Sequence, residues 1–408
     1  MNILFYTWHE FTYQDGYDAF VAMGHNVTRI YYEWKNLAGD ETFERLLLDE
    51  LAKTRDGSDG SDAGARGDFG TKPFYDFVFS FNFFPVVSIA CNKTNTPYIS
   101  LVFDSPFLPL TSIQIHNPCN YIYTFDRKQA ERMRTEGCER IFYSPLGVNA
   151  ERLKEQAEPY YAEPWLHDIS FLGQLYSGYD FYDQIDGHTT LPGYLKGWMD
   201  GVIAAQEHVF GFDLIGDADV VSPEKIREFH GYVDFAMTDN FRIDEDEVLR
   251  DVLRRKVSKV ERPKLLSMLA KYFPVDLYTI PKETAPEGVK KHGYADYRTE
   301  MPHIFNRSKI NLNITMRTII SGIPLRVLDV MAAGGFLITT YQEEVAAQFA
   351  DGEELVIAYS PEDLLEKCAY YLAHEEEREA IARRGREKVL ESYDYQTIIN
   401  NILRHQFF

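Results

Sequence analysis

The segment between Ile304 and Glu344 carries the clearest chemistry in the chain. Its pattern predicts a strand, a loop, a helix, a glycine turn and a second strand. Gly322 permits close approach of the backbone, and Pro324 suits a first helical turn. The N–H groups at such a helix start could hold a phosphate. The alternative is an ordinary turn ahead of a capped helix.

Charged residues flank the same predicted helix. Arg317 and Arg326 could neutralise a phosphate, and Asp329 lies one turn beyond Arg326 on nearly the same face. A carboxylate there could accept hydrogen bonds from the two hydroxyls of a ribose. The alternative is a surface ion pair between Arg326 and Asp329, worth roughly 0.2–0.5 kcal/mol.

Candidate acid–base groups lie in the first third of the chain. Asp104 ends a strand predicted to be central, and its carboxylate could deprotonate a hydroxyl. His9 follows the first predicted strand, with Glu10 beside it, and could act as a base or as a hydrogen-bond donor. Asp104 could instead cap the next turn, and His9 could be structural. Asn82, after another strand, is a further candidate.

Predicted strands and helices alternate in both halves of the chain. In the first half the predicted strands are 2–7, 26–32, 77–81, 98–103, 121–125 and 140–143. In the second half they are 168–172, 274–280, 309–314, 336–340 and 355–358. Such alternation indicates parallel sheets covered on both faces.

The predicted fold class is α/β, with two Rossmann-like doubly wound domains facing across a cleft. The first domain spans 1–150 and the second 160–392, and a C-terminal helix at 394–408 packs back on the first. A glycine-rich loop at 54–71, a linker at 149–167 and a charged helical insert at 176–271 complete the plan. Ligands of doubly wound folds bind at the carboxyl ends of the strands, so we expect the site there.

Composition narrows the function further. The net charge of −21 over 408 residues argues against nucleic acid or anionic lipid as a partner. None of the four cysteines forms a C-x-x-C pair, which argues against a zinc ribbon or a dithiol site. The start of the chain has the pattern of a strand and not of a signal peptide, and no apolar run could span a bilayer. We therefore expect a cytoplasmic protein.

As a set, these motifs resemble the donor-binding region of GT-B glycosyltransferases. They are most similar to a bacterial group 1-like family that shares the glycosyltransferase-like domain of spore-maturation proteins. The similar positions in the second half are Met301-Pro302, Asn306, Ser308 to Asn313, Ser321 to Arg326, Asp329, Ala333 to Phe336, Asp351 to Glu354 and Tyr359 to Leu364. In the first half they are Phe103 to Pro106, Asn117-Pro118 and Phe125 to Arg127.

The resemblance implies a nucleoside diphosphate-sugar donor, with a UDP-sugar foremost, held by the second domain. It implies an acceptor hydroxyl bound by the first domain, on a bacterial surface glycan or a protein, and no obligatory metal or other cofactor. The catalytic candidates are Asp104 and His9. The expected donor-binding residues, including two tyrosines that could stack on a base or a sugar, are Gly173, Tyr176, Tyr278, Arg317, Ser321, Gly322, Ile323, Pro324, Leu325, Arg326 and Asp329.

The sequence departs from retaining relatives of this class at two places. Those relatives carry Glu-x7-Glu, in which the second Glu binds ribose and the first contacts the sugar; here Asp329 and Ser321 stand there. They also keep an Arg and a Lys after the first strand of the second domain, where this chain has Gly173 to Tyr176. Arg317, Arg326 or Arg262 would then supply the positive charge.

Three other functions fit parts of the pattern. A nucleotide-sugar 2-epimerase shares the architecture but needs carboxylates around the sugar, and Ser321 argues against it. A non-catalytic protein that binds a sugar or a partner would tolerate the missing cations. A dinucleotide oxidoreductase is disfavoured because no G-x-G-x-x-G follows either first strand.

Overall fold

The computed structural model separates the chain into two compact units. Unit 1 comprises Met1–Leu146, Ala236–Ile243 and Tyr395–Phe408, and unit 2 comprises Gly147–Phe235 and Asp244–Asp394. The structure describes residues 1–36, 39–55, 72–157, 164–178, 181–188, 191–233, 240–241 and 245–407. Most of the predicted loop at 54–71 and the middle of the predicted linker lie outside these residues.

Unit 1 contains a six-stranded parallel sheet in the order β2-β1-β3-β4-β5-β6. Its strands are β1 (Asn2–Thr7), β2 (Asn26–Tyr31), β3 (Phe77–Phe81), β4 (Tyr98–Val102), β5 (Asn120–Thr124) and β6 (Ile141–Tyr143). Every residue of β3 and β4 is buried, as expected for central strands covered on both faces. The register places Leu4 of β1 opposite Val78 of β3.

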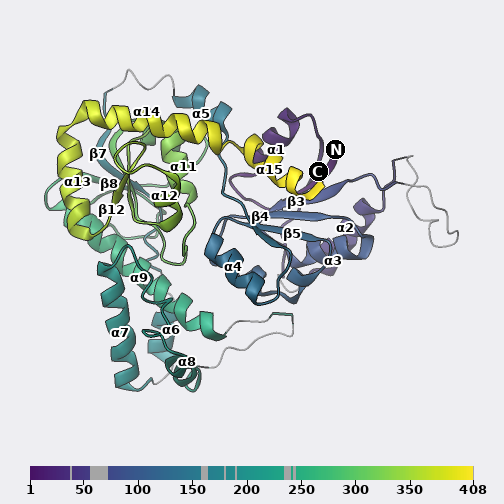
Figure 1. Cartoon of the computed structure of the whole chain (residues 1–408), viewed down its shortest axis with the longest axis horizontal. Helices are drawn as coiled ribbons and strands as arrows, with labels where there is room; N and C mark the ends of the chain where they lie inside the picture. The colour runs from purple at the N-terminus through teal and green to yellow at the C-terminus, as the bar shows by residue number, and fades with distance from the viewer. Residues whose placement is uncertain are drawn as a thin grey trace. The chain divides into compact units, whose positions relative to one another are not determined.

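The helices of unit 1 cover both faces of this sheet (Figure 1). They are α1 (Tyr13–Ala22), α2 (Glu41–Leu51), α3 (Pro85–Thr94), the 3-10 turns η1 (Leu108–Thr111) and η2 (Ile113–His116), α4 (Arg127–Thr135) and α15 (Tyr395–Phe407). Asp126 caps α4 by accepting a hydrogen bond from the backbone N–H of Gln129, as its position predicts. The C-terminal helix α15 belongs to unit 1, where His405 contacts the hydroxyl of Tyr123.

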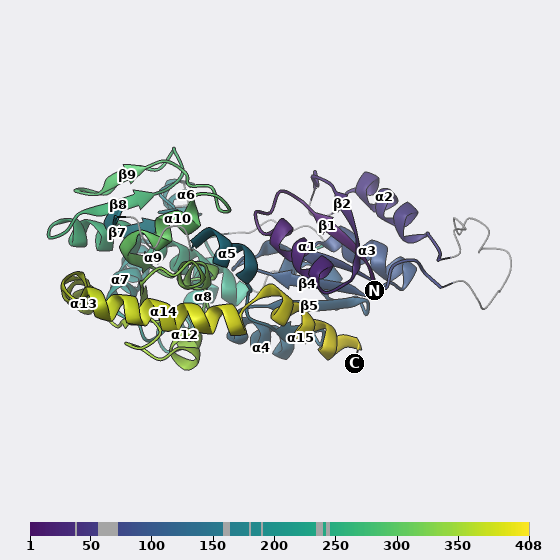
Figure 2. The same cartoon turned by 90° about the horizontal axis from the view of Figure 1, so that it is seen from above.

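Unit 2 contains a second six-stranded parallel sheet, in the order β12-β11-β10-β7-β8-β9. Its strands are β7 (His167–Leu172), β8 (Val275–Tyr278), β9 (Lys290–His292), β10 (Ser308–Asn313), β11 (Leu337–Thr340) and β12 (Val356–Ala358). Figure 2 shows β9 at the outer edge, beyond β8. The two sheets confirm the prediction of two Rossmann-like domains; their facing across a cleft stays a prediction.

The helices of unit 2 form two groups. Those near the sheet are α5 (Ala150–Ala157), α10 (Met301–Asn306), α11 (Leu325–Ala332), α12 (Glu343–Gln348), α13 (Pro361–Ala373) and α14 (Glu375–Ser392). The insert consists of α6 (Phe181–His188), α7 (Gly193–His208), α8 (Pro223–His230) and α9 (Glu245–Ala270). The insert has an apolar core of its own, and its helices gather around one end of α9 (Figure 1).

Two local features differ from the sequence-based expectation. The helix α5 lies within the segment predicted as a linker, and it begins where the Asn149 side chain accepts a hydrogen bond from the backbone N–H of Arg152. The strand β9 was not predicted, because Lys290-Lys291-His292 lacks the apolar alternation of a strand. Among the described residues no helix is both long and apolar enough to cross a membrane.

The turn after α11 shows why two glycines stand there. Gly334 has a φ of +81°, a conformation that favours glycine, and its N–H bonds the carbonyl of Met331. A Cβ on Gly335 would lie 2.7 Å from both the Phe305 carbonyl and the Asn311 amide. The pair therefore ends the helix and lets β11 start against its neighbours.

Candidate functional site

Four loops meet at the carboxyl edge of the sheet in unit 2. They follow β7 (173–176), β8 (279–283), β10 (314–324) and β11 (341–342). Because all the strands of this sheet are parallel, their carboxyl ends share one edge. Doubly wound sheets bind their ligands at this edge.

The helix α11 starts at this edge without a side-chain cap. Its N-cap residue is Pro324, at φ −62° and ψ 142°, and in this described segment no cap side chain accepts from the first turn. The preceding residues from Ser321 to Ile323 are buried, so the backbone of the turn is held in place. The N–H groups at Leu325 and Arg326 therefore begin a helix whose positive dipole end faces the loops.

Asp329 lies on α11 as a buried carboxylate, and its partners include Tyr297 and Arg326. The hydroxyl of Tyr297 donates to its Oδ1 at 2.9 Å, and Arg326 Nη1 lies 3.4 Å from its Oδ2. Arg326 and Asp329 thus form the ion pair that the alternative interpretation expected. Only 5% of Asp329 is exposed, however, so its carboxylate is buried and does not lie on the surface. A carboxylate oxygen can accept more than one hydrogen bond, so a partner at each oxygen does not by itself exclude a hydroxyl ligand.

Arg317 is paired with a carboxylate from α9. Its Nε donates to Glu261 Oε2 at 3.0 Å, and its Nη2 contacts the other oxygen of the same carboxylate. The guanidinium also lies over the ring of Phe210, 5.1 Å from its centre. Its charge is therefore matched by Glu261, and its predicted contact with a phosphate stays a prediction.

Arg262, the next residue of α9, bridges two loops of the edge. Its Nη1 donates to the Gln174 carbonyl at 2.6 Å, and its Nε and Nη2 donate to the Ile314 carbonyl at 3.0 and 2.7 Å. The guanidinium lies 4.9 Å from the centre of the Tyr176 ring. A cation thus reaches the loop after β7 from α9, and it is Arg262, one of the three arginines that the sequence offered for this charge.

The loop after β7 is fixed by further contacts. The Gly173 N–H donates to the Tyr278 carbonyl at 3.0 Å, and the Leu175 N–H donates to Glu283 Oε2 at 2.7 Å. Tyr176 follows with a φ of +57°, which is unusual for a residue with a side chain. These contacts bring Gly173 and Tyr176 to the same edge as the start of α11.

Ser321 holds a carboxylate that sequence reasoning missed. Its Oγ donates to Glu344 Oε1 at 2.8 Å, and the Glu344 N–H donates to the Ser321 carbonyl at 3.0 Å. Glu344 is buried and stands in the first turn of α12. The signal in the sequence was the pair Glu343-Glu344, separated by two residues from the end of the predicted strand at 336–340.

Tyr278 is directed elsewhere. It is the last residue of β8, but its hydroxyl lies 2.8 Å from Nε2 of His167, the first residue of β7. Its ring stacks on His292 with 4.4 Å between the centres. Since β7 and β8 are parallel, the side chain points back toward the amino ends of the strands, away from the other predicted donor residues.

The carboxyl edge of unit 1 holds Asp104. Asn82 follows β3 at a φ of +62°, and its Nδ2 donates to Asp104 Oδ2 at 2.8 Å. The Oδ1 of the same Asn82 accepts from the Phe103 N–H at 3.0 Å. Burial raises the pKa of Asp104 above its usual range, while the hydrogen bond from Asn82 opposes this shift. Asn82 therefore positions the carboxyl group.

His9 lies at the same edge and is exposed. Its Nε2 contacts the carboxylate of Glu33 and the hydroxyl of Tyr31, which is 2.6 Å away. The hydrogen bond to Glu33 raises the pKa of Tyr31 to about 12 and lowers that of Glu33. His9 is thus held in a small polar network on the surface.

Glu10, the neighbour of His9, is the more unusual group. Only 3% of it is exposed, and Oε2 accepts from the Trp8 N–H at 2.6 Å. Its other oxygen, Oε1, is buried with no hydrogen-bond partner among the described residues. Burial raises the pKa of Glu10 to about 7, against the lowering effect of Arg29. The sequence shows Glu10 beside His9, but the burial that makes Glu10 unusual cannot be read from the sequence.

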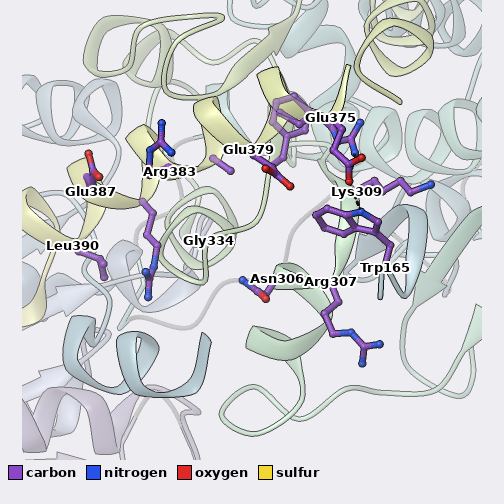
Figure 3. A pocket seen from close by; sticks show the side chains of 14 residues that line it. Trp165, Asn306, Arg307, Lys309, Gly334, Glu375, Glu379, Arg383, Glu387 and Leu390 are labelled. Atoms are coloured by element: carbon purple, nitrogen blue, oxygen red, sulfur yellow. Dashed lines mark hydrogen bonds and ion pairs between the residues drawn. The ribbon is translucent and has the colours of Figure 1, made fainter. Parts of the chain in front are cut away.

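A cavity of about 660 Å³ lies at the opposite edge of the sheet of unit 2. Its lining includes Trp165 before β7, Lys309 at the start of β10, Gly334 before β11, and side chains of α14 such as Glu379 and Arg383 (Figure 3). The Trp165 indole donates to Glu375 at 2.8 Å across it. It is lined from the amino ends of the strands and is separate from the loops described above.

Comparisons with known proteins identify a glycosyl transferase-like segment in the second half of the chain. Residues 263–404 match the family described as "Glycosyl transferase-like", a little over a third of the chain. No curated protein matches.

Two solved structures share the fold at low identity. One is the sucrose-phosphate synthase of Thermosynechococcus elongatus, with 10% identity, a TM-score of 0.52 and coverage of 100% of this chain and 99% of that one. The other is an alpha-glucosyltransferase in complex with UDP-glucose and DNA containing an abasic site, with 9% identity, a TM-score of 0.52 and the same coverage. The chain therefore has the GT-B class of fold, with a glycosyl transferase-like segment at 263–404; the narrower likeness to spore-maturation proteins stays a prediction.

Proposed function

We propose that the protein is a glycosyltransferase that moves a sugar from a nucleoside diphosphate-sugar, foremost a UDP-sugar, to an acceptor hydroxyl. The observation that carries the proposal is the uncapped start of α11 with the buried carboxylate of Asp329 on the same helix. The match of residues 263–404 to a glycosyl transferase-like family supports it.

The diphosphate of the donor would bind at the start of α11. Helix-start N–H groups and the helix dipole favour an anion, and the guanidinium of Arg262 adds positive charge at the Gln174 and Ile314 carbonyls. This charge would stabilise the nucleoside diphosphate as it leaves. Arg317 and Arg326 contribute less in this account, because each has a carboxylate partner.

Asp329 would hold the ribose. Tyr297 and Arg326 each contact a different oxygen of its carboxylate, so its orientation is set before the ligand arrives. Burial strengthens a hydrogen bond from a ribose hydroxyl to this carboxylate. Tyr176, whose ring lies beside the Arg262 guanidinium, would stack on the base.

In retaining relatives of this class, the residue equivalent to Ser321 contacts the donor sugar. In this chain Glu344 would make that contact. Ser321 has no carboxylate, but its hydroxyl binds the Glu344 carboxylate beside it. A carboxylate therefore stands next to this position although the sequence lacks one there. Its neighbourhood, and not Ser321 alone, would decide which sugar is accepted.

The acceptor hydroxyl would lose its proton to a carboxylate of unit 1. A general base works best with a pKa near the working pH, and Glu10, with a pKa of about 7, fits that requirement. Asp104 and His9 are the other candidates. The hydroxyl oxygen then bonds to the anomeric carbon, the bond to the diphosphate breaks, and the diphosphate leaves with the electron pair.

A thermal-shift screen of nucleoside diphosphates in EDTA tests the proposal. UDP at 100 times its Kd should add about 2.7 kcal/mol of stability to the wild type, and at the same concentration Asp329→Ala should lose about half of that increment or more. Asp219→Ala, an exposed site on the insert, is the matched control. If no nucleotide raises the Tm, the transferase proposal fails and a non-catalytic binding protein becomes the better account.

A shift that appears only with added divalent metal would contradict the expected metal independence. Transfer assays with candidate glycan and protein acceptors would follow, because acceptor identity stays a prediction.

A further inference from the structure

Three potential metal ligands meet on neighbouring strands of unit 2. They are His167 of β7, Asp276 of β8 and His292 of β9, and one ligand atom from each lies within 4.8 Å of the others. His167 Nδ1 lies 3.0 Å from Asp276 Oδ2, and His292 Nε2 lies 2.6 Å from Asp276 Oδ1. In the part of the chain that the structure describes, this is the one such group.

We propose that His167, Asp276 and His292 bind a zinc ion that fastens the edge strand β9 to β8 and β7. This site is independent of the proposed transferase activity, because its ligands are not among the groups that would hold the donor or the acceptor.

The donor set fits zinc. Two imidazole nitrogens and one carboxylate oxygen are ligands that zinc prefers, and zinc bonds to them are about 2.0–2.2 Å long. A tetrahedral ion with such bonds keeps its ligand atoms roughly 3.3 Å apart. The longest separation between two of the three ligand atoms would therefore shorten by about 1.5 Å at most when the ion binds.

The surroundings of His167 support the assignment. Its second ring nitrogen, Nε2, lies 2.8 Å from the hydroxyl of Tyr278, so a proton on Nε2 would leave Nδ1 open toward Asp276. Metal-bound histidines usually make such a second hydrogen bond, which fixes the ring.

Exposure of the third ligand leaves room for a fourth. The side chains of His167 and Asp276 are 4% and 8% exposed, whereas that of His292 is 24% exposed. Water could therefore complete the tetrahedron on the side of His292. For zinc to bind, the proton on each ligating ring nitrogen would move to the other nitrogen of the same ring, so that both imidazoles stay neutral.

A role in stability follows from the position of β9. It is a three-residue edge strand with a polar sequence, Lys290–His292, and its ladder pairs with β8 alone. Such a short strand gains little from its own packing. A metal bond from His292 would hold it in register with Tyr278.

Substitution of Lys290 tests the proposal, because the proposal predicts the direction in which zinc affinity changes. Its Nζ lies 3.7 Å from Asp276 Oδ1, and its side chain is 74% exposed, so it can swing into solvent when a cation binds. Lys290→Met should tighten zinc binding several-fold, because it removes a competing positive charge. His292→Ala should abolish binding.

The experiment measures the zinc content of the full chain after dialysis against low zinc, by elemental analysis of folded protein. We expect about one zinc in wild type and in Lys290→Met, and almost none in His292→Ala. Equal zinc in wild type and His292→Ala would overturn the site, as would none in either.

A second measurement separates metal binding from simple hydrogen bonding among the three groups. EDTA should lower the Tm of zinc-loaded wild type by about 4 °C or more and leave His292→Ala unchanged. Cobalt in place of zinc should give the absorption of a tetrahedral site in wild type only. If EDTA shifts both proteins equally or neither, the carboxylate merely bonds two imidazoles and the proposal is wrong.

Discussion

Both units have acidic side chains at the edge of the sheet where the parallel strands end. The surroundings of these side chains differ between the two units. At the edge of unit 2, Asp329, Glu283 and Glu344 each accept hydrogen bonds from named donors. At the edge of unit 1, Glu10 is buried and Asp104 is half-buried, and burial raises the pKa of each. The same fold thus places groups suited to holding a ligand in one unit and groups suited to proton transfer in the other.

The difference arises from the side chains that surround each carboxyl group. Burial without a paired cation favours the protonated acid and moves its pKa toward neutral pH. Donors aimed at a carboxylate keep it fixed and ready to accept a ligand hydroxyl. We therefore expect variants in unit 1 to affect turnover and variants in unit 2 to affect donor affinity.

The largest expected effect is on turnover in unit 1. Glu10→Gln should lower transfer about 100- to 1000-fold at saturating donor, because an amide cannot take the acceptor proton. Glu41→Gln, on the exposed first turn of α2, is the control. Unchanged turnover in Glu10→Gln would remove Glu10 as the base and leave Asp104 and His9.

The next effect is on stability against pH. The pKa of Glu10 is raised in the folded state, so its contribution is fully present at pH values below its ordinary pKa of 4.5 and is lost as pH rises through about 7. The free energy of unfolding should fall by on the order of 3 kcal/mol between pH 4.5 and 8 from this group. Urea unfolding across that range should show the fall in wild type, and Glu10→Gln should show much less of it. Parallel curves would contradict the buried, raised-pKa state.

Donor affinity in unit 2 should change by a smaller amount. Asp329→Ala should raise the Kd for UDP about 10- to 100-fold, the loss of one or two hydrogen bonds to a charged group. Calorimetry on Asp329→Ala and the control Asp219→Ala measures this. An unchanged Kd would mean that the ribose binds elsewhere.

The smallest expected effect concerns the sugar. Glu344→Gln should weaken binding of the preferred UDP-sugar about 10-fold and leave UDP alone unaffected, because only the sugar would reach this carboxylate. The adjacent exposed residue gives the control Glu343→Gln. Equal losses for UDP and UDP-sugar would assign Glu344 to the loop structure instead.

Alternation of strands and helices was sufficient to predict the fold class, because parallel sheets covered on both faces leave a clear apolar pattern. The start of α11 was also predictable, since Gly322 and Pro324 mark it locally. Groups whose role depends on a partner far away in the sequence could not be predicted. Glu10 owes its raised pKa to burial, and Glu344 is brought to Ser321 by the turn into α12.

The most direct test of the division between the units is calorimetric titration of UDP, in EDTA, into wild type, Asp329→Ala and Glu10→Gln. The account predicts that Asp329→Ala raises the Kd at least about 10-fold, while Glu10→Gln keeps it within about twofold of wild type. A Kd that rises in Glu10→Gln and stays unchanged in Asp329→Ala would contradict the assignment of the donor to unit 2.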